Sequence, residues 1–168
     1  MKRLFSLLTL CALMLALTAC GAPAAPSGSA ASGAASDSEI SFDAVYQGIL
    51  DAQENADELV FFPEESADAI ESLYPGLSAL NPVRLQLYLP PVTGFACEIL
   101  LVEVAEGDVD AARAILQDRI DSGASDTGYP ENAVLWQSNA QVQVQGSCLC
   151  MIALPDGYTI PENVFALG

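Results

Sequence analysis

The first regular hydrophobic pattern of the chain is helical and spans residues 42–74. Behind Ser41, a residue type that often caps helices, apolar side chains recur at helical spacing and predict an amphipathic helix over residues 42 to about 57. Residues 64–74 predict a second, shorter helix, because acidic side chains occupy its first turn and Tyr74-Pro75-Gly76 ends it. We therefore expect two helices ahead of the strands.

From residue 83 onward, the spacing of apolar residues changes to that of strands. Segment 83–89 alternates apolar and polar side chains, which is typical of a strand with one buried face. Segment 95–104 is almost continuously apolar, as in a central strand covered on both faces. The same two patterns return later. Segment 141–145 alternates glutamine with valine and predicts an edge strand, and segment 148–154 is again continuously apolar.

Helical patterns separate and follow these strands. Residues 107–122, ended by Gly123, predict a long helix, residues 130–137 a short one, and residues 161–167 a closing helical turn. Together the elements predict an α+β fold in a single small domain over residues 39–168. We expect a four-stranded, mostly antiparallel sheet (ββ-α-ββ) with helices packed on it, preceded by the two N-terminal helices.

The first residues of the chain carry the pattern of a bacterial lipoprotein signal peptide. Two cationic residues precede an apolar run over residues 4–19, which is shorter than the roughly 20 residues that a membrane-spanning helix needs. The run ends in Leu17-Thr18-Ala19-Cys20-Gly21, which matches the lipobox of bacterial lipoproteins. We expect a cleaved signal peptide over residues 1–19 and a diacylglyceryl group, with fatty acids such as palmitate, on Cys20. The alternative is an uncleaved anchor helix with a chance cysteine.

Segment 20–38 links the expected lipid to the folded domain. After Cys20 it contains only small side chains, proline and one aspartate, a composition that cannot bury a core. Such a chain behaves as a flexible tether with a root-mean-square reach of roughly 20–25 Å. The tether favours the lipid anchor over an anchor helix. We therefore expect the domain to be held at the cell membrane by its lipid and to face the extracellular side.

The charge and composition exclude several classes of function. The chain has 22 acidic and five cationic residues, a net charge of −17, and loss of Lys2 and Arg3 with the signal peptide would leave three arginines and a net charge of −19. Such a charge repels phosphate polymers, so we expect no nucleic-acid partner. Histidine is absent and no lysine follows Lys2, which removes the commonest general base, the commonest zinc ligand and Schiff-base chemistry.

Arg119 is the main candidate for a special role. On a helical wheel it falls within the apolar arc of its helix, where a guanidinium needs a carboxylate or carbonyl partner. Glu98, a lone charge in an apolar strand, is the natural partner. Three interpretations stay open: a structural ion pair, a side chain that reaches past the core to water, and an arginine lining a pocket for an anionic ligand.

Three cysteines fall in the predicted central strands. Cys148 and Cys150 share one face of the last strand, where thiols two residues apart are too distant for easy bridging, and Cys97 lies in the other central strand. A disulfide from Cys97 suits an exported protein but requires that the strands pair, and it leaves one thiol over. We expect buried free thiols that act as small apolar residues, with a redox or copper site as the alternative.

Four acidic residues crowd the junction between the second strand and the long helix: Glu103, Glu106, Asp108 and Asp110. Their oxygens suit Ca²⁺, but the aspartate and glycine spacing of a calcium loop is missing. Acidic side chains at this place more simply stabilise the helix N-terminus. We therefore expect neither a metal nor a cofactor.

Residues 70–155 resemble a family of small lipoproteins of Gram-positive gut bacteria whose domain has no assigned activity. The matching residues are Glu98-Ile99, Ala111-Ala112, Leu116, Arg119-Ile120, Tyr129-Pro130-Glu131 and Gly146. The resemblance implies an exported lipoprotein and supplies no catalytic residues. Members commonly have an aromatic residue two positions after the glycine, where this chain has Cys148, so no role is expected for an aromatic there.

These features favour a non-catalytic binding or interaction domain, whose protein or small-molecule partner the sequence does not identify. One alternative is a carboxylate-dependent hydrolase, which would need two acids about 5–10 Å apart in a cleft. Another is a ligand-sensing accessory subunit of an envelope system, which a deep pocket lined by Arg119 would favour.

Overall fold

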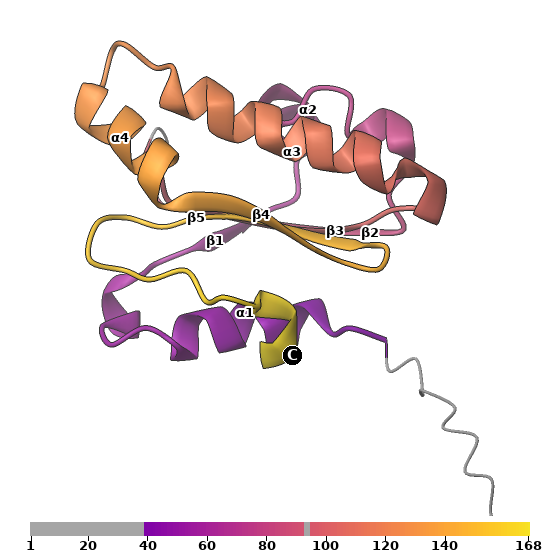
Figure 1. Ribbon diagram of the computed structural model, residues 1–168, viewed down its shortest axis with the longest axis horizontal. Coiled ribbons are helices and arrows are strands. Elements are labelled where there is room, and N and C mark those ends of the chain that lie inside the picture. The colour runs from indigo at the N-terminus through magenta and orange to yellow at the C-terminus, as the bar shows by residue number, and fades with distance from the viewer. Residues whose placement is uncertain (1–38, 93–94) are drawn as a thin grey trace, which may run out of the picture. The chain divides into compact units, whose positions relative to one another are not determined.

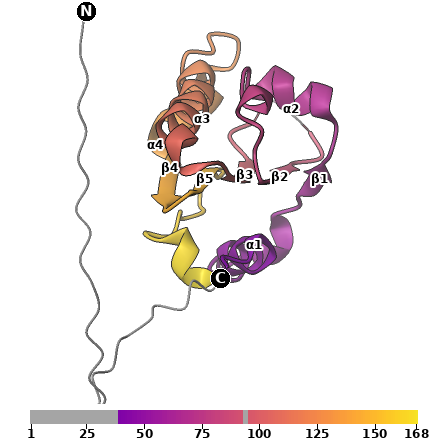
Figure 2. The same ribbon diagram turned by 90° about the vertical axis from the view of Figure 1, so that its right-hand side faces the viewer.

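A computed structural model describes residues 39–92 and 95–168 of the chain. The predicted signal peptide, Cys20 and the tether up to residue 38 lie outside the described residues, and so do Thr93 and Gly94. Within the described part, a single antiparallel sheet lies between two layers of helix (Figures 1 and 2). The α+β class predicted from the sequence is confirmed.

The sheet has five strands in the order β1-β2-β3-β5-β4, and every neighbouring pair is antiparallel. The strands are β1 (Phe62–Glu64), β2 (Arg84–Leu89), β3 (Glu98–Glu103), β4 (Ala140–Gln145) and β5 (Cys148–Ala153). As expected, the two continuously apolar strands β3 and β5 are central, and β4 lies at an edge. Gly146, at a φ of 60°, supplies the left-handed residue of the tight turn that joins β4 to β5.

The prediction of four strands was wrong by one. β1 has only three residues, too few to show an alternating pattern, and Pro63 lies in its middle. Proline is tolerated at a sheet edge, where its missing N–H costs no ladder hydrogen bond. β1 therefore forms because β2 offers a partner, through the pairs Phe62–Leu89 and Glu64–Leu87, and not because of its own sequence.

The described residues contain four α-helices: α1 (Phe42–Asp51), α2 (Ala67–Leu73), α3 (Val109–Ala124) and α4 (Pro130–Ser138). α1 ends six residues before the predicted limit of about 57, and a separate 3₁₀ helix, Ala56–Glu58, follows it. α2 begins after Ser66, whose hydroxyl accepts from the amide of Ala69, because Glu64 belongs to β1 instead.

Gly123 does not end the long helix as predicted but lies inside α3. A Cβ atom at this position would lie 2.4 Å from Cδ2 of Trp136, so the absence of a side chain lets α4 approach α3 closely. The glycine therefore serves helix packing and not helix termination, which spacing along one helix does not reveal.

The two faces of the sheet form two separate cores. α2, α3 and α4 cover one face, and α1 with the C-terminal 3₁₀ helix Val164–Leu167 covers the other (Figures 1 and 2). Alternate residues of β3 serve the two sides: Leu100 and Val102 pack under α3, and Ile99 and Leu101 pack on the side of α1. This double burial explains the continuous hydrophobicity of β3 and β5. No helix in the described segments is long and apolar enough to cross a membrane.

Candidate functional site

The structure brings together the two residues singled out from the sequence. Nη2 of Arg119 lies 2.7 Å from Oε2 of Glu98, and Nε lies 3.3 Å from Oε1, which is the bidentate geometry typical of an arginine–carboxylate pair. The Glu98 side chain is 2% exposed and the Arg119 side chain 17%. The pair is therefore largely removed from water, where leaving either charge alone would be costly.

Two aromatic residues complete this cluster. The hydroxyl of Tyr74, directly after α2, donates to Oε1 of Glu98, and the guanidinium carbon of Arg119 lies 4.5 Å from the centre of the Trp136 ring on α4. Arg119 itself comes from α3 and Glu98 from β3. The four side chains thus connect three helices to one strand. Sequence reasoning missed both aromatics, because neither has a pattern that marks a polar contact.

Burial and the neighbouring charges shift the pKa values of Arg119 and Tyr74 in this network. Burial alone would lower the pKa of Arg119, but its hydrogen bonds and attraction to Glu98 outweigh this and raise the pKa above its ordinary value. Burial, followed by the negative charge of Glu98, raises the pKa of Tyr74 well above its ordinary value. Both shifts favour the protonated forms, a cationic Arg119 and a neutral Tyr74.

The network leaves little of Arg119 for a ligand. Cavities of about 260 and 280 Å³ open beside it, the first toward Leu73 and Ile115 and the second toward Asp126 and Asn132. Its guanidinium is nevertheless engaged by Glu98 on its edge and by Trp136 on its face. Both oxygens of Glu98 are occupied in turn, so the geometry does not suit Glu98 as the acid of a hydrolase.

The three cysteines of the described residues are buried free thiols. In the register of the sheet, Cys150 lies opposite Leu101 and Cys148 opposite Glu103, so neither faces Cys97, which precedes the start of β3. Burial, then the charge of Glu98, raises the pKa of Cys97 to about 11, and burial also raises the pKa of Cys150. Thiols held neutral in this way behave as small apolar residues.

The acidic residues that the sequence places near the start of α3 do not form one group in the fold. Glu103 is engaged by Arg84, whose Nε lies 2.7 Å from its Oε2. In the described parts of the chain, no group of three or more cysteine, aspartate or glutamate side chains is placed to hold a metal ion.

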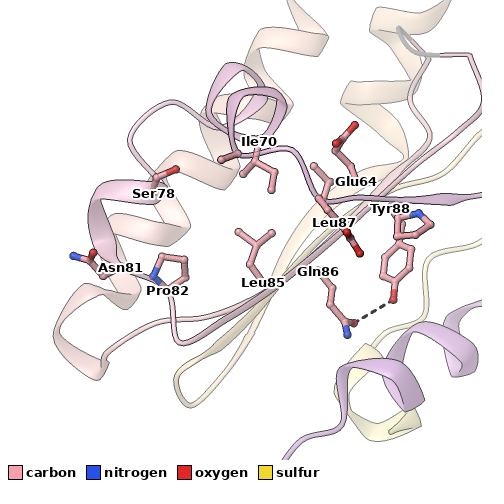
Figure 3. A pocket seen from close by; sticks show the side chains of 12 residues that line it. Glu64, Ile70, Ser78, Asn81, Pro82, Leu85, Gln86, Leu87 and Tyr88 are labelled. Atoms are coloured by element: carbon pink, nitrogen blue, oxygen red, sulfur yellow. Dashed lines mark hydrogen bonds between the residues drawn. The ribbon is translucent and has the colours of Figure 1, made fainter.

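A groove that the sequence did not suggest lies on the same face of the sheet, between β2 and α2. It measures about 600 Å³, and its apolar lining includes Ile70, Pro82, Leu85 and Leu87. In Figure 3, Ile70 faces Leu85 across the groove, and Ser78 lines the same space. The groove is assembled by residues 63–88, but the sequence contains no signal for it, because it exists only where α2 is held above the strand.

The backbone of β2 is open where the groove begins. In an antiparallel pair, residues that exchange backbone hydrogen bonds with the partner strand alternate with residues that point their backbone groups the other way. The amide of Leu154 donates to the carbonyl of Asn139, which shows which residues of β4 and β5 bond to each other. The registers of the other strand pairs extend this alternation across the sheet to β2. By this alternation, Leu85 and Leu87 direct their N–H and C=O groups toward β1. β1 ends at Glu64, opposite Leu87, so no strand lies beside Leu85. The groove therefore lies where a longer β1 would have paired with β2 beside Leu85.

The rim of the groove is polar and acidic. Glu64, Glu65, Ser78 and Asn81 line it together with the apolar residues, and no cationic side chain does. Glu64 accepts a hydrogen bond from the amide of Ser66, which orders the rim where the chain turns from β1 into α2. The exposed carboxylate of Glu65 has no such backbone partner among the hydrogen bonds of the described residues, so it is available to a cation.

Comparisons with known proteins add no relative: no family model, no curated protein and no solved structure matches the chain. The resemblance of residues 70–155 to lipoproteins of gut bacteria therefore stays a prediction, and the function has to be argued from the geometry.

We expect Arg119→Leu to destabilise the fold strongly. The leucine would leave the buried carboxylate of Glu98 without its cation, and losses of this kind cost about 3–5 kcal/mol. Urea denaturation followed by circular dichroism measures the change. The matched control is Arg113→Leu, an exposed arginine of the same helix, which should change the free energy of unfolding by less than about 0.5 kcal/mol. Equal effects of the two substitutions would show that the pair does not stabilise the fold.

We also expect the fold to lose stability in alkali. Groups whose pKa is raised by folding stabilise the folded state below their unfolded pKa, and this contribution disappears as the pH rises toward the folded value. For Cys97, with a pKa of about 11 in the fold, the loss should run from about pH 9 to pH 11, and that of Tyr74 should follow at higher pH. The measurement is the free energy of unfolding under reducing conditions. Cys97→Ala should reduce the slope between pH 9 and pH 11 and leave the part that Cys150 contributes, and an unchanged slope would contradict the assignment.

Proposed function

We propose that this protein is a membrane-anchored extracytoplasmic lipoprotein whose folded domain is a non-catalytic binding domain, with its binding site in the groove between β2 and α2. The observation that carries the proposal is the groove itself: an apolar floor with a polar rim next to an unpaired length of strand. Pockets with a mainly apolar lining and a few placed polar groups are the usual form of binding sites.

The shape and backbone of the groove favour an extended segment of a partner chain. A segment laid along β2 beyond the end of β1 would meet the N–H and C=O groups of Leu85, as in recognition by strand addition. One of its side chains would enter the space between Leu85 and Ile70. The hydrogen bonds would give affinity, and the apolar space would select the side chain.

The charge of the rim favours a cationic segment. Glu64 and Glu65 are the acidic residues of the lining, and the chain as a whole carries a net charge of −17. An acidic surface attracts cations from solution and concentrates them near the site. We therefore infer that the ligand combines an apolar side chain with lysine or arginine.

The anchor rests on sequence features alone: the lipobox that ends in Cys20 and the segment of small residues up to residue 38. A lipid at that position would hold the groove near the outer face of the membrane. A binding domain at that place meets exported or cell-surface partners.

For the anchor, we expect the native protein extracted from membranes to lack residues 1–19 and to carry a diacylglyceryl group on Cys20. Intact-mass spectrometry measures both changes together. Cys20→Ala should stay uncleaved and unmodified, because the modified thioether is the substrate of the cleavage step. An unacylated Cys20 in the membrane fraction, or a cytosolic native protein, would overturn the anchor without touching the groove.

For the groove, we expect a six-residue peptide of alternating valine and lysine to bind saturably, and one of alternating valine and glutamate not to bind. Fluorescence anisotropy of the labelled peptide measures the affinity. Ser78→Trp should fill the groove and weaken binding at least about tenfold, whereas Ala79→Trp, exposed and one residue further in the same 3₁₀ helix, should not.

A second pair of variants distinguishes peptide binding at the acidic rim of the groove from attraction to the overall negative charge of the chain. Glu65→Gln should weaken binding of the cationic peptide, and Glu162→Gln, which removes an equally exposed acid outside the groove lining, should leave it unchanged. If both substitutions act alike, or if Ala79→Trp blocks the peptide as well as Ser78→Trp does, the peptide binds the acidic surface at large and the proposed site is wrong.

A further inference from the structure

The outer edge of β4 is open along its length. The ladder bond from the amide of Leu154 to the carbonyl of Asn139, and the tight turn after Gln145, place the odd-numbered residues of β4 in hydrogen-bonded pairs with β5. The N–H and C=O groups of Val142 and Val144 therefore point away from β5. No residue of the described segments hydrogen-bonds to these groups, and β4 is the last strand of the sheet (Figure 2).

The opposite edge of the same sheet is protected. By the same alternation, Pro63 occupies the position of β1 whose N–H would face outward, and proline has none. β1 is also only three residues long and ends in Glu64. Short strands, prolines and charges are the usual means by which proteins prevent pairing at an edge. β4 has none of them: it is six residues long and reads AQVQVQ.

The open edge also lies in an uncharged part of a strongly acidic chain. Between Glu131 and Asp156 the sequence contains no charged residue, although the chain has 22 acids and a net charge of −17. Two copies of such a chain repel each other at most places on their surfaces. β4 itself adds no charge to that repulsion, and it offers no charge to attract an ionic partner.

We propose that β4 pairs with β4 of a second copy of this chain, antiparallel and across a two-fold axis, so that one sheet continues through both copies. The edge is self-complementary for this arrangement. Only even-numbered residues present their backbone groups outward, so they must face each other in every hydrogen-bonded register. Val142 and Val144 then lie opposite valine or Ala140, and glutamine lies opposite glutamine, as the symmetry of an isologous interface requires.

The area of one strand pair is small, so we expect a weak dimer that depends on concentration. The inference does not depend on the peptide groove, which lies at the other end of the sheet, beside β1 and β2. A lipid anchor would raise the local concentration of copies, but the pairing does not require it.

The test is sedimentation equilibrium of the full chain in density-matched detergent over a range of protein concentrations. We expect a monomer–dimer equilibrium. Val144→Lys, at a side chain that is 40% exposed, should weaken dimerisation at least about tenfold, because each copy then places a lysine on the pairing edge, and lysine on an edge strand opposes pairing. Val83→Lys, at an exposed valine ahead of β2, adds the same charge far from β4 in the sheet and should dimerise like the original chain.

Three results would overturn the inference: a chain that stays monomeric at every concentration, Val144→Lys and Val83→Lys that dimerise alike, or a dimer that Ser78→Trp disrupts. The last would place the contact at the groove instead. Val142→Pro gives a second, independent variant, because it removes an outward N–H that β5 does not use. It should also be monomeric, with a circular dichroism spectrum like that of the original chain.

Discussion

The buried carboxylate of Glu98 is the constraint on which the arrangement of the helical layer depends. A charge at the start of a central strand is tolerated only if the surrounding elements supply partners, and here the partners come from α3 and the end of α2. α3 provides Arg119, the end of α2 provides Tyr74, and α4 provides the Trp136 ring that covers the guanidinium. Helices joined through one carboxylate and its arginine have little freedom to slide over the apolar face of the sheet.

That constraint determines where the groove lies. Tyr74 holds the end of α2 near the start of β3, so the rest of α2 and the 3₁₀ helix after it stand over β2. β1 ends early, because the chain must turn into α2 after Glu64. The open length of β2 and the space under Ile70 therefore arise together, from one short strand and one fixed helix.

The two edge strands of the sheet, β1 and β4, differ in length, charge and regularity. The edge at β1 combines proline, an acid and the groove rim, which suits a small and selective contact. The edge at β4 is neutral, regular and longer, which suits pairing with an identical strand. The strong negative charge of the chain makes this difference matter for both proposals, because it would oppose contacts between copies outside the uncharged stretch and would attract cationic ligands to the acidic rim.

The sequence by itself determined the fold class, the central place of β3 and β5 and the edge position of β4, because burial on one or two faces leaves a direct periodic trace. It also paired Arg119 with Glu98, since each is a lone charge among apolar residues. Tertiary structure alone decided the fifth strand, the role of Gly123 under Trp136, the part of Tyr74 and the groove beside Leu85. These features depend on contacts between segments distant in sequence, and no local pattern of a single helix or strand records which distant surface it will meet.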